Sequence, residues 1–248
     1  MNTYTITILF LVIIFAATLI RSSMGFGDAL IAMPLLVLLI GLKTATPISA
    51  MLSITIALLI LAGNWKGMQF KSIWRLIVAS AIGTPIGLFF LKGNYDSLMQ
   101  IILGTLLILF STYKLFVPKL MRISSMKPAY IFGFLAGLFG GAFNTSGPFI
   151  VIYAELKNWS PNIFRTTLQG YFLAGNIFII TLHGASGLWT KQVLILFLTA
   201  LPVIIVTTFL GGKLNHIIPK DKFDKLIYCF LLAIGFLLIL RTSYIVCL

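Results

Sequence analysis

The stretch GGAFNTSGP, residues 140–148, places three hydrogen-bonding side chains between two strongly apolar runs. These side chains are Asn144, Thr145 and Ser146. The flanking glycines permit unusual backbone conformations, and the closing proline is favoured in the first turn of a helix. The pattern therefore predicts that one apolar helix ends just before the polar residues and that another begins just after them.

The composition around this break is that of a membrane protein. Apolar residues make up 60% and charged residues 9% of the 248 residues, and the mean hydropathy is +1.09. A helix needs about 20 apolar residues to cross roughly 30 Å of hydrocarbon, and the chain contains many such runs joined by short connections. A soluble globular protein is excluded. We expect an all-α polytopic membrane protein that forms one membrane domain over residues 1–248.

The net charge of +13 could suggest a nucleic-acid partner, but the placement of the basic residues argues against one. They gather in three short connections between apolar runs, at residues 64–75, 118–127 and 213–225. Connections rich in Lys and Arg stay on the cytoplasmic side of a bilayer. We therefore predict a multi-pass protein of the cell (inner or plasma) membrane, with these connections in the cytoplasm and both termini outside.

The apolar runs form two sets of five. The first set covers residues 3–21, 28–42, 44–63, 73–91 and 97–117, and the second covers 129–143, 148–156, 161–182, 191–212 and 224–246. Because five is an odd number, a duplicated unit must sit upside down relative to its partner, as in many secondary transporters. We predict two inverted-topology repeats, about 3–117 and 128–247. Each has a broken or re-entrant helix pair followed by three transmembrane helices.

The segment after the opening break, residues 148–156, is too short to cross a bilayer alone. Its nine residues make only about 14 Å of helix. We expect the break to lie near the bilayer midplane, where irregular backbone needs protein or a water-filled cavity around it. The start of such a helix presents unpaired N–H groups and a partial positive charge, which favour an anion.

Candidate anion-binding residues occur in both breaks. In the second half they are Asn144, Thr145, Ser146 and Gly147. The first-half break, RSSMGFGD at residues 21–28, supplies Ser22, Ser23 and Gly25. The side chains would donate hydrogen bonds, and the glycines would let the backbone approach a ligand closely.

Structural interpretations of the same residues stay open. Ser, Thr and Asn cap helices routinely, so the three polar residues of the second break could serve only to shape it. Gly133 and Gly137 have the small-xxx-small spacing of closely packed membrane helices. We predict that these two glycines serve packing.

A polar stripe runs along the predicted helix at residues 161–182. At about 100° per residue, its members lie within about 40° of Arg165 on one face; they are Arg165, Gln169, Phe172, Asn176 and His183. Arg165 and His183 could simply reach the two membrane interfaces, whereas Gln169 and Asn176 lie deeper. An offset of 119 residues places a weaker stripe in the first half, made of Thr46, Ser53 and Asn64.

Acidic residues are scarce, with five in the chain, and only Asp28 lies in a break. Asp28 is either the N-cap of its helix or a protonatable group that couples transport to protons. Arg21, at the other side of the break, is either its charge partner or an anion contact. Without convergent acids or histidines, a cation carrier or a membrane enzyme is disfavoured, and we expect neither a metal nor another cofactor.

Three stretches resemble the TauE/SafE sulfite-exporter family of membrane transporters. They are SSMGFGDALIAMPLL (22–36), LKTATPISAML (42–52) and GFLAGLFGGAFNTSGPFIVIYAELKNWSPNIFRTTLQGYFLAGN (133–176). The resemblance implies transport of small sulfur-containing anions such as sulfite, sulfoacetate or other sulfonates, coupled to an ion gradient. Many members carry a run of glycines in the first break, where this chain has GFGDA with Asp28.

The sequence as a whole thus predicts a secondary transporter with a midplane site between the two breaks. The expected partners are a small anionic substrate and the lipid bilayer. Whether the protein forms a homo-oligomer is left open by the sequence. Arg165, Gln169 and Asn176 would add to the site, with Arg165 and Gln169 lining the cytoplasmic approach. A passive anion channel or a non-transporting membrane scaffold are the alternatives. A water-filled cavity that reaches Thr145 from one side only would favour a carrier.

Overall fold

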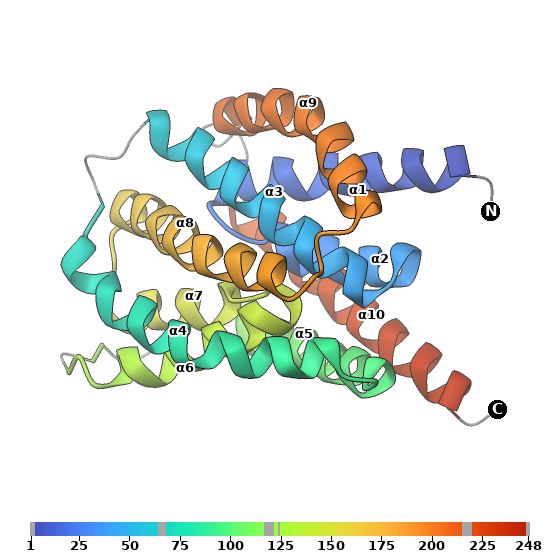
Figure 1. The fold of residues 1–248 in the computed structure, drawn as a ribbon. Coiled ribbons are helices and arrows are strands. Elements are labelled where there is room, and N and C mark those ends of the chain that lie inside the picture. Colours follow the sequence, from blue (N-terminus) through green and yellow to red (C-terminus); the bar gives the residue numbers. More distant parts are fainter. Residues whose placement is uncertain (1–2, 64–67, 117–121, 124, 215–219, 247–248) are drawn as a thin grey trace.

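The computed structural model describes residues 3–63, 68–116, 122–123, 125–214 and 220–246. Within these ranges the chain forms ten helices and no strand (Figure 1). The helices are α1 Thr3–Met24, α2 Asp28–Ile40, α3 Leu42–Gly63, α4 Phe70–Lys92, α5 Asp96–Phe116, α6 Pro128–Phe143, α7 Gly147–Leu156, α8 Pro161–Ala185, α9 Lys191–Leu214 and α10 Lys220–Val246. Asn64 and parts of the basic connections lie outside the described residues.

The helices match the predicted segments one for one, and the all-helical membrane class is confirmed. Six of the described helices are long and apolar enough to cross a membrane: α1, α3, α4, α5, α9 and α10. Helix α8 has 25 residues but is not among them, because its polar stripe lowers its hydropathy. Helices α2, α6 and α7 are shorter, with 13, 16 and 10 residues.

The first break is shorter than predicted. Helix α1 continues to Met24, so Ser22 and Ser23 belong to its last turn and only residues 25–27 are non-helical. The helix ends where the N–H of Gly25 donates to the carbonyl of Arg21 at 2.6 Å. Gly25 and Gly27 have φ angles of 93° and 104°, a backbone region that residues with a Cβ rarely adopt. These two glycines therefore set the length of the break.

The second break lies where the sequence predicts it. Asn144 adopts a left-handed conformation with φ of 53°, and its N–H donates to the carbonyl of Gly140 at 2.8 Å. It therefore ends α6 through its backbone. Ser146 occupies the N-cap position of α7 but makes no side-chain capping bond. Its hydroxyl therefore does not cap α7 as a serine at this position often does, and the backbone of Ser146 is already helical (φ −77°, ψ −18°).

Contacts between the halves organise the bundle. The most extensive ones pair α4 with α6, α5 with α10, α1 with α9, and α3 with α8. In addition, α3 packs on α9 and α8 packs on α4. Because α3 and α8 contact each other and also contact helices of both halves, they form the centre of the bundle. The start of α1 and the end of α10 lie toward the same side of the molecule (Figure 1).

Glycines allow α4 and α6 to pack backbone to backbone. A Cβ added at Gly133, Gly137 or Gly141 of α6 would collide with main-chain atoms of α4, and one at Gly83 or Gly87 of α4 would collide with main-chain atoms of α6. The prediction that Gly133 and Gly137 serve helix packing is confirmed. Close approach of this kind replaces the hydrophobic driving force that helices lack inside a bilayer.

Candidate functional site

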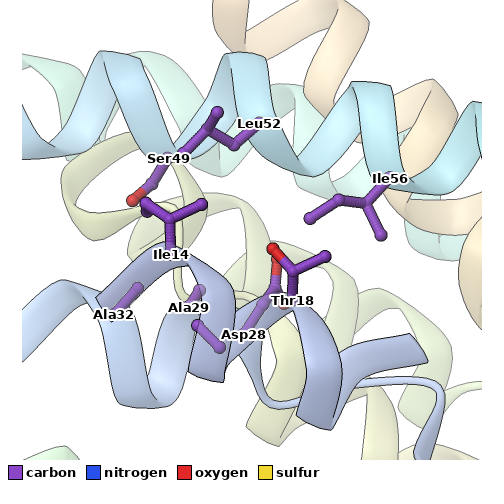
Figure 2. A pocket seen from close by; sticks show the side chains of 9 residues that line it. Ile14, Thr18, Asp28, Ala29, Ala32, Ser49, Leu52 and Ile56 are labelled. Atoms are coloured by element: carbon purple, nitrogen blue, oxygen red, sulfur yellow. The ribbon is translucent and has the colours of Figure 1, made fainter. Parts of the chain in front are cut away.

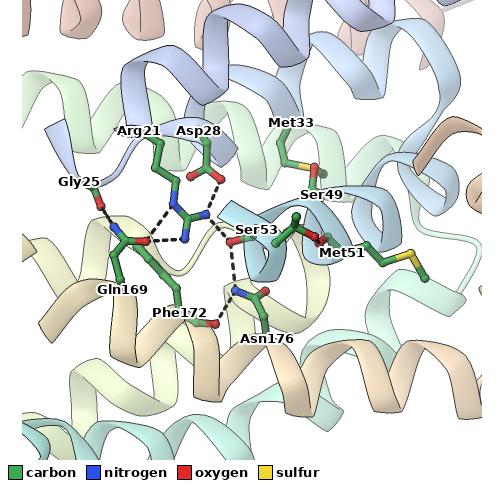
Figure 3. Close-up of polar contacts among 11 residues, drawn as sticks. Arg21, Gly25, Asp28, Met33, Ser49, Met51, Ser53, Gln169, Phe172 and Asn176 are labelled. Atoms are coloured by element: carbon green, nitrogen blue, oxygen red, sulfur yellow. Dashed lines mark hydrogen bonds and ion pairs between the residues drawn. The ribbon is translucent and has the colours of Figure 1, made fainter. Parts of the chain in front are cut away.

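The last turn of α1 brings a charged side chain into the centre of the protein. Arg21 is fully buried, with 0% of its surface exposed. Its Nη1 atom forms an ion pair with Oδ2 of Asp28 at 2.6 Å and donates to Oγ of Ser53 at 2.5 Å (Figure 3). Its Nε and Nη2 atoms donate to Oε1 of Gln169 at 3.3 and 2.8 Å. Every nitrogen of the guanidinium group therefore has a partner.

Asp28 is the charge partner of Arg21, one of the two roles considered for this arginine. For Asp28 itself, the interpretation as the N-cap of α2 is wrong, because Gly27 occupies that position and Asp28 is the first helical residue. The short Gly25–Gly27 turn brings the carboxylate back onto the guanidinium. A buried charge is tolerated in an apolar interior when it is paired and hydrogen-bonded.

Helix α8 supplies the other wall of the site through its polar stripe. Nε2 of Gln169 donates to the carbonyl of Gly25 at 2.6 Å. Nδ2 of Asn176 donates to Oγ of Ser53 at 3.1 Å and to the carbonyl of Phe172 at 2.7 Å (Figure 3). Between them, the ring of Phe172 lies under the Arg21 guanidinium, 4.7 Å from its carbon to the ring centroid. The predicted stripe thus faces the first break.

We call Arg21, Asp28, Ser53, Gln169 and Asn176 the Arg21 cluster. It joins α1, α2, α3 and α8, so helices from both halves contribute. One polar atom within it, Oδ1 of Asn176, is buried without a hydrogen-bond partner. A buried polar atom left unpaired is unfavourable, and an acceptor of this kind suits a ligand that carries a proton.

Of the other residues predicted for the first break, Gly25 alone joins the Arg21 cluster, through its carbonyl. The hydroxyl of Ser23 donates to the carbonyls of Leu19 and Gly211 at 2.8 and 3.3 Å, which ties α1 to α9. The hydroxyl of Ser22 is buried without a partner. The carbonyl of Ser22 accepts a 2.5 Å hydrogen bond from Nη2 of Arg165.

Arg165 is half-buried and reaches back to the end of α1. His183, at the far end of the stripe, is fully buried. Its Nε2 atom lies 3.2 Å from the carbonyl of Gly141. The interpretation of His183 as a side chain that reaches the outer interface is therefore wrong. The reason is that α6 ends beside α8 and leaves carbonyl groups that need partners.

The second break is buried but is separate from the Arg21 cluster. Asn144, Thr145 and Ser146 are 5%, 0% and 6% exposed. The hydroxyl of Thr145 donates to the carbonyl of Phe143 at 3.0 Å, whereas Nδ2 of Asn144 has no hydrogen-bond partner. Among the described residues, no hydrogen bond joins these side chains to the Arg21 cluster.

Sequence reasoning missed a polar pair beside the second break. The hydroxyl groups of Tyr171 and Ser80 lie 2.9 Å apart, and Ser146 also interacts with Tyr171. Tyr171 is buried and lies on α8 next to the polar stripe. The sequence signal that could have identified Tyr171 is its position next to Phe172 of the polar stripe. A tyrosine buried there needs a hydrogen-bond partner, so a polar neighbour could have been expected.

A small cavity lies beside Asp28. It is lined by Ile14, Ala17, Thr18, Asp28, Ala29, Ala32, Ser49, Leu52 and Ile56 (Figure 2). Its volume, about 10 Å³, admits at most about one water molecule. The side chain of Asp28 is 13% exposed and that of Arg21 is 0% exposed. The conformation described here is therefore closed around the arginine, and Asp28 is the residue that both pairs with Arg21 and lines the cavity.

A larger groove of about 520 Å³ lies between α3, α4 and α8. Its lining is entirely apolar: Leu58, Leu61, Ala62, Met68, Phe70, Gly170, Leu173, Ala174 and Ile177. Such a surface offers no hydrogen bond to an anion. Thr145 lines neither of these two cavities.

Taken together, apolar helices long enough to span a bilayer and a buried ion pair at a helix break define a polytopic membrane protein with an internal polar site. Comparison with protein families gives a match to the family described as Sulfite exporter TauE/SafE over residues 9–238. The chain belongs to this family of membrane transporters. The comparisons with curated proteins and with solved structures each gave no match.

Proposed function

We propose that the protein is a secondary transporter of small sulfur-containing anions, such as sulfite, sulfoacetate or other sulfonates, driven by an ion gradient. Membership of the sulfite exporter family supports transport of this class of substrate. The single observation that carries the proposal is the fully buried guanidinium of Arg21, held at a helix break by side chains from three other helices.

Arginine suits such a substrate for a chemical reason. Its planar guanidinium presents parallel N–H groups that match two oxygens of a tetrahedral or pyramidal oxyanion. An ionisable residue inside a transmembrane bundle is unfavourable unless it is paired, and such residues mark ion and substrate pathways. Gln169, Asn176 and Ser53 would then add neutral hydrogen-bonding groups around the bound anion.

The proposed architecture is one membrane domain made of two inverted repeats. If α1–α5 correspond to α6–α10, the contact between α4 and α6 has its equivalent in the contact between α9 and α1. In the same way, the contact between α3 and α9 has its equivalent in the contact between α8 and α4. Both members of each pair are present. Two positions offset by 119 residues also behave alike: Thr46 donates to the carbonyl of Ala142, and Arg165 donates to the carbonyl of Ser22. These equivalences support a pseudo-two-fold axis in the membrane plane.

In this architecture the second break contributes from the opposite side of the site. Asn144 has a buried amide nitrogen without a partner, and the start of α7 with Gly147 adds a helix N-terminus. Both favour a negative charge. Thr145 and Ser146 stay proposed contacts. Rocking of the three-helix sets, α3–α5 and α8–α10, around the two breaks would expose the site to each side in turn.

Counterflow in proteoliposomes tests the proposal. Vesicles loaded with unlabelled sulfite or methanesulfonate should accumulate the labelled anion faster than empty vesicles, and the rate should saturate. Chloride should not compete. A passive channel would give no acceleration by internal anion, and a scaffold protein would give no flux. Either result would contradict a carrier.

The Arg21→Lys variant tests the site itself. Lysine keeps the positive charge but loses the planar fork, so counterflow should fall at least about tenfold, equivalent to the loss of one charge-assisted hydrogen bond. Arg75→Lys is the matched control, because Arg75 stacks on Trp74 of the same helix and does not contact the Arg21 cluster. Equal activity of the two variants would remove Arg21 from the site.

A further inference from the structure

We propose that Asp28 and the transported anion compete for Arg21, so that each monovalent anion crosses the membrane together with one proton carried by Asp28. This inference rests on the proposed function and specifies its coupling ion and the charge of its substrate. It follows from the geometry of the ion pair, its burial and the cavity beside it.

The Arg21 side chain has no room for an anion while its partners stay in place. Gln169 holds the Nε and Nη2 atoms, and Asp28 and Ser53 hold Nη1. Gln169 is itself fixed to the carbonyl of Gly25. Asp28 is the one partner of Arg21 that lines the small cavity and has measurable exposure. An anion that enters from the cavity therefore reaches Arg21 by displacing the carboxylate.

Charge balance then requires a proton. The Arg21–Asp28 pair is neutral overall, so an added monovalent anion would leave one uncompensated negative charge in an apolar interior, which is strongly unfavourable. If a proton from the aqueous side first binds the carboxylate, the ion pair breaks and the anion takes the place of the carboxylate at Nη1. The site stays neutral. On the other side the anion leaves, the proton leaves, and the ion pair forms again.

Among the described residues, Arg21 is the one charged group that pairs with Asp28. Arg165 of α8 lies at the same break, but its guanidinium donates to the carbonyl of Ser22. From α1 and α3, the cavity presents the neutral hydroxyl groups of Thr18 and Ser49. Helices α1, α3, α5 and α10 pack on α2. Apart from Arg21, the titratable or charged residues of these helices whose side chains are described are Tyr4, Lys43, Asp96, Tyr113, Lys114, Lys225, Tyr228, Cys229, Arg241 and Tyr244. No ion pair or hydrogen bond of the described residues joins these groups to Asp28. Lys114 pairs instead with Glu155 of α7.

The same balance predicts substrate charge. A monoanion such as a simple sulfonate or hydrogen sulfite restores neutrality beside Arg21 and a protonated Asp28. A dianion such as sulfoacetate leaves one negative charge unpaired and would bind more weakly, unless a second proton accompanies it. Transport of a monoanion with one proton moves no net charge across the membrane.

Proton uptake during anion binding tests the inference directly. Purified wild-type protein in weakly buffered detergent solution near neutral pH is titrated with methanesulfonate, which stays ionised, while a pH-sensitive dye reports free protons. We expect uptake of about one proton per bound anion, as linkage requires. The Asp28→Asn variant should bind methanesulfonate without taking up a proton. Asp96→Asn, the control, removes an exposed acid at the start of α5 and should behave like the wild type.

A second measurement keeps the inference testable even if Asp28→Asn fails to fold. In wild-type proteoliposomes, methanesulfonate uptake should rise with an inward proton gradient and should not respond to membrane potential. Binding without proton uptake, or uptake driven by the potential alone, would overturn the inference and leave the transporter proposal intact. A complete lack of binding and counterflow for every sulfur anion would instead overturn the proposed function, and the inference with it.

Discussion

Arg21 shows how one buried charge can organise a membrane site. Removal of a guanidinium from water is unfavourable by several kcal/mol even after relaxation, and here a carboxylate, a hydroxyl and an amide oxygen replace the lost hydration. A cluster of this kind is stable only when every partner is present. The Arg21–Asp28 pair should therefore be energetically coupled as well as functionally coupled.

Removal of one member of the pair should destabilise the protein more than removal of both. Arg21→Gln leaves the Asp28 carboxylate buried and unpaired, so we expect a loss of about 3–5 kcal/mol and a clear fall of the Tm in detergent. The double variant Arg21→Gln/Asp28→Asn should recover a large part of the loss, because no charge stays buried. Neither variant should show counterflow. Additive losses in the double variant would mean that the two residues are not coupled.

Asn144 has two roles that a pair of variants can separate. Its left-handed backbone is easily adopted by glycine but not by alanine. If the amide contacts the anion, Asn144→Gly should keep the Tm of the wild type and still reduce the apparent affinity in counterflow. Asn144→Ala should lower both the Tm and the affinity. Full transport activity of Asn144→Gly would mean that the residue only shapes the break.

The pair α4 and α6 differs from the pair α1 and α9 in how it is held together. Five glycines let the backbones of α4 and α6 approach each other, whereas the contact of α1 with α9 includes one such glycine, Gly211, against Leu19 and Ser22. Backbone contact leaves little freedom to slide, because interiors are close-packed. We therefore expect α4 and α6 not to slide along each other when the three-helix sets rock.

A single methyl group should test this packing. Gly137→Ala places a Cβ against the carbonyl of Ser80, so the helices must separate, and we expect a loss of about 1–3 kcal/mol as for other overpacked cores. Gly212→Ala of α9 is the matched control, because no atom of the described residues lies within 4 Å of its Cβ position and alanine favours helix. Thermal unfolding in detergent measures both. A Tm of Gly137→Ala equal to that of the control would contradict the close approach.

The path of the chain through the membrane depends on the molecule as a whole. The start of α1 and the end of α10 lie toward the same side (Figure 1), which agrees with the proposed location of both termini outside. The basic connection that precedes α6 would then face the cytoplasm. The turn between α4 and α5, around Asn94, would face outside.

Labelling of single cysteines in intact cells tests this orientation. In a background in which Cys229 and Cys247 are replaced by serine, Met126→Cys and Asn94→Cys each place a thiol at an exposed position. A membrane-impermeant maleimide should label residue 94 in intact cells and residue 126 only after the membrane is opened. The reverse pattern would invert the proposed topology, and labelling of both in intact cells would exclude it.

Local features of the chain were sufficient to predict the helices and the positions of the two breaks. Apolar runs of suitable length predict spanning helices whatever their neighbours, and glycine with proline predicts where helices stop. The boundary of α1 was the exception, since Arg21, Ser22 and Ser23 look like break residues but continue the helix to Met24. Polar residues do not end a helix whose backbone groups can still pair internally. The helix ends at the following glycine, Gly25, whose N–H makes the last bond to the carbonyl of Arg21.

Composition, charge placement and spacing therefore identified a polytopic helical membrane protein and a polar face on α8, and they predicted two repeated halves. They left open whether Arg21 pairs with Asp28, whether Asp28 caps α2, and where His183 points. Only the packed helices decided these points, because Arg21 and Gln169 are 148 positions apart in the chain and meet only when α1 and α8 are assembled. The period of a helix determines which side chains share a face, whereas the register and crossing of neighbouring helices determine what that face touches.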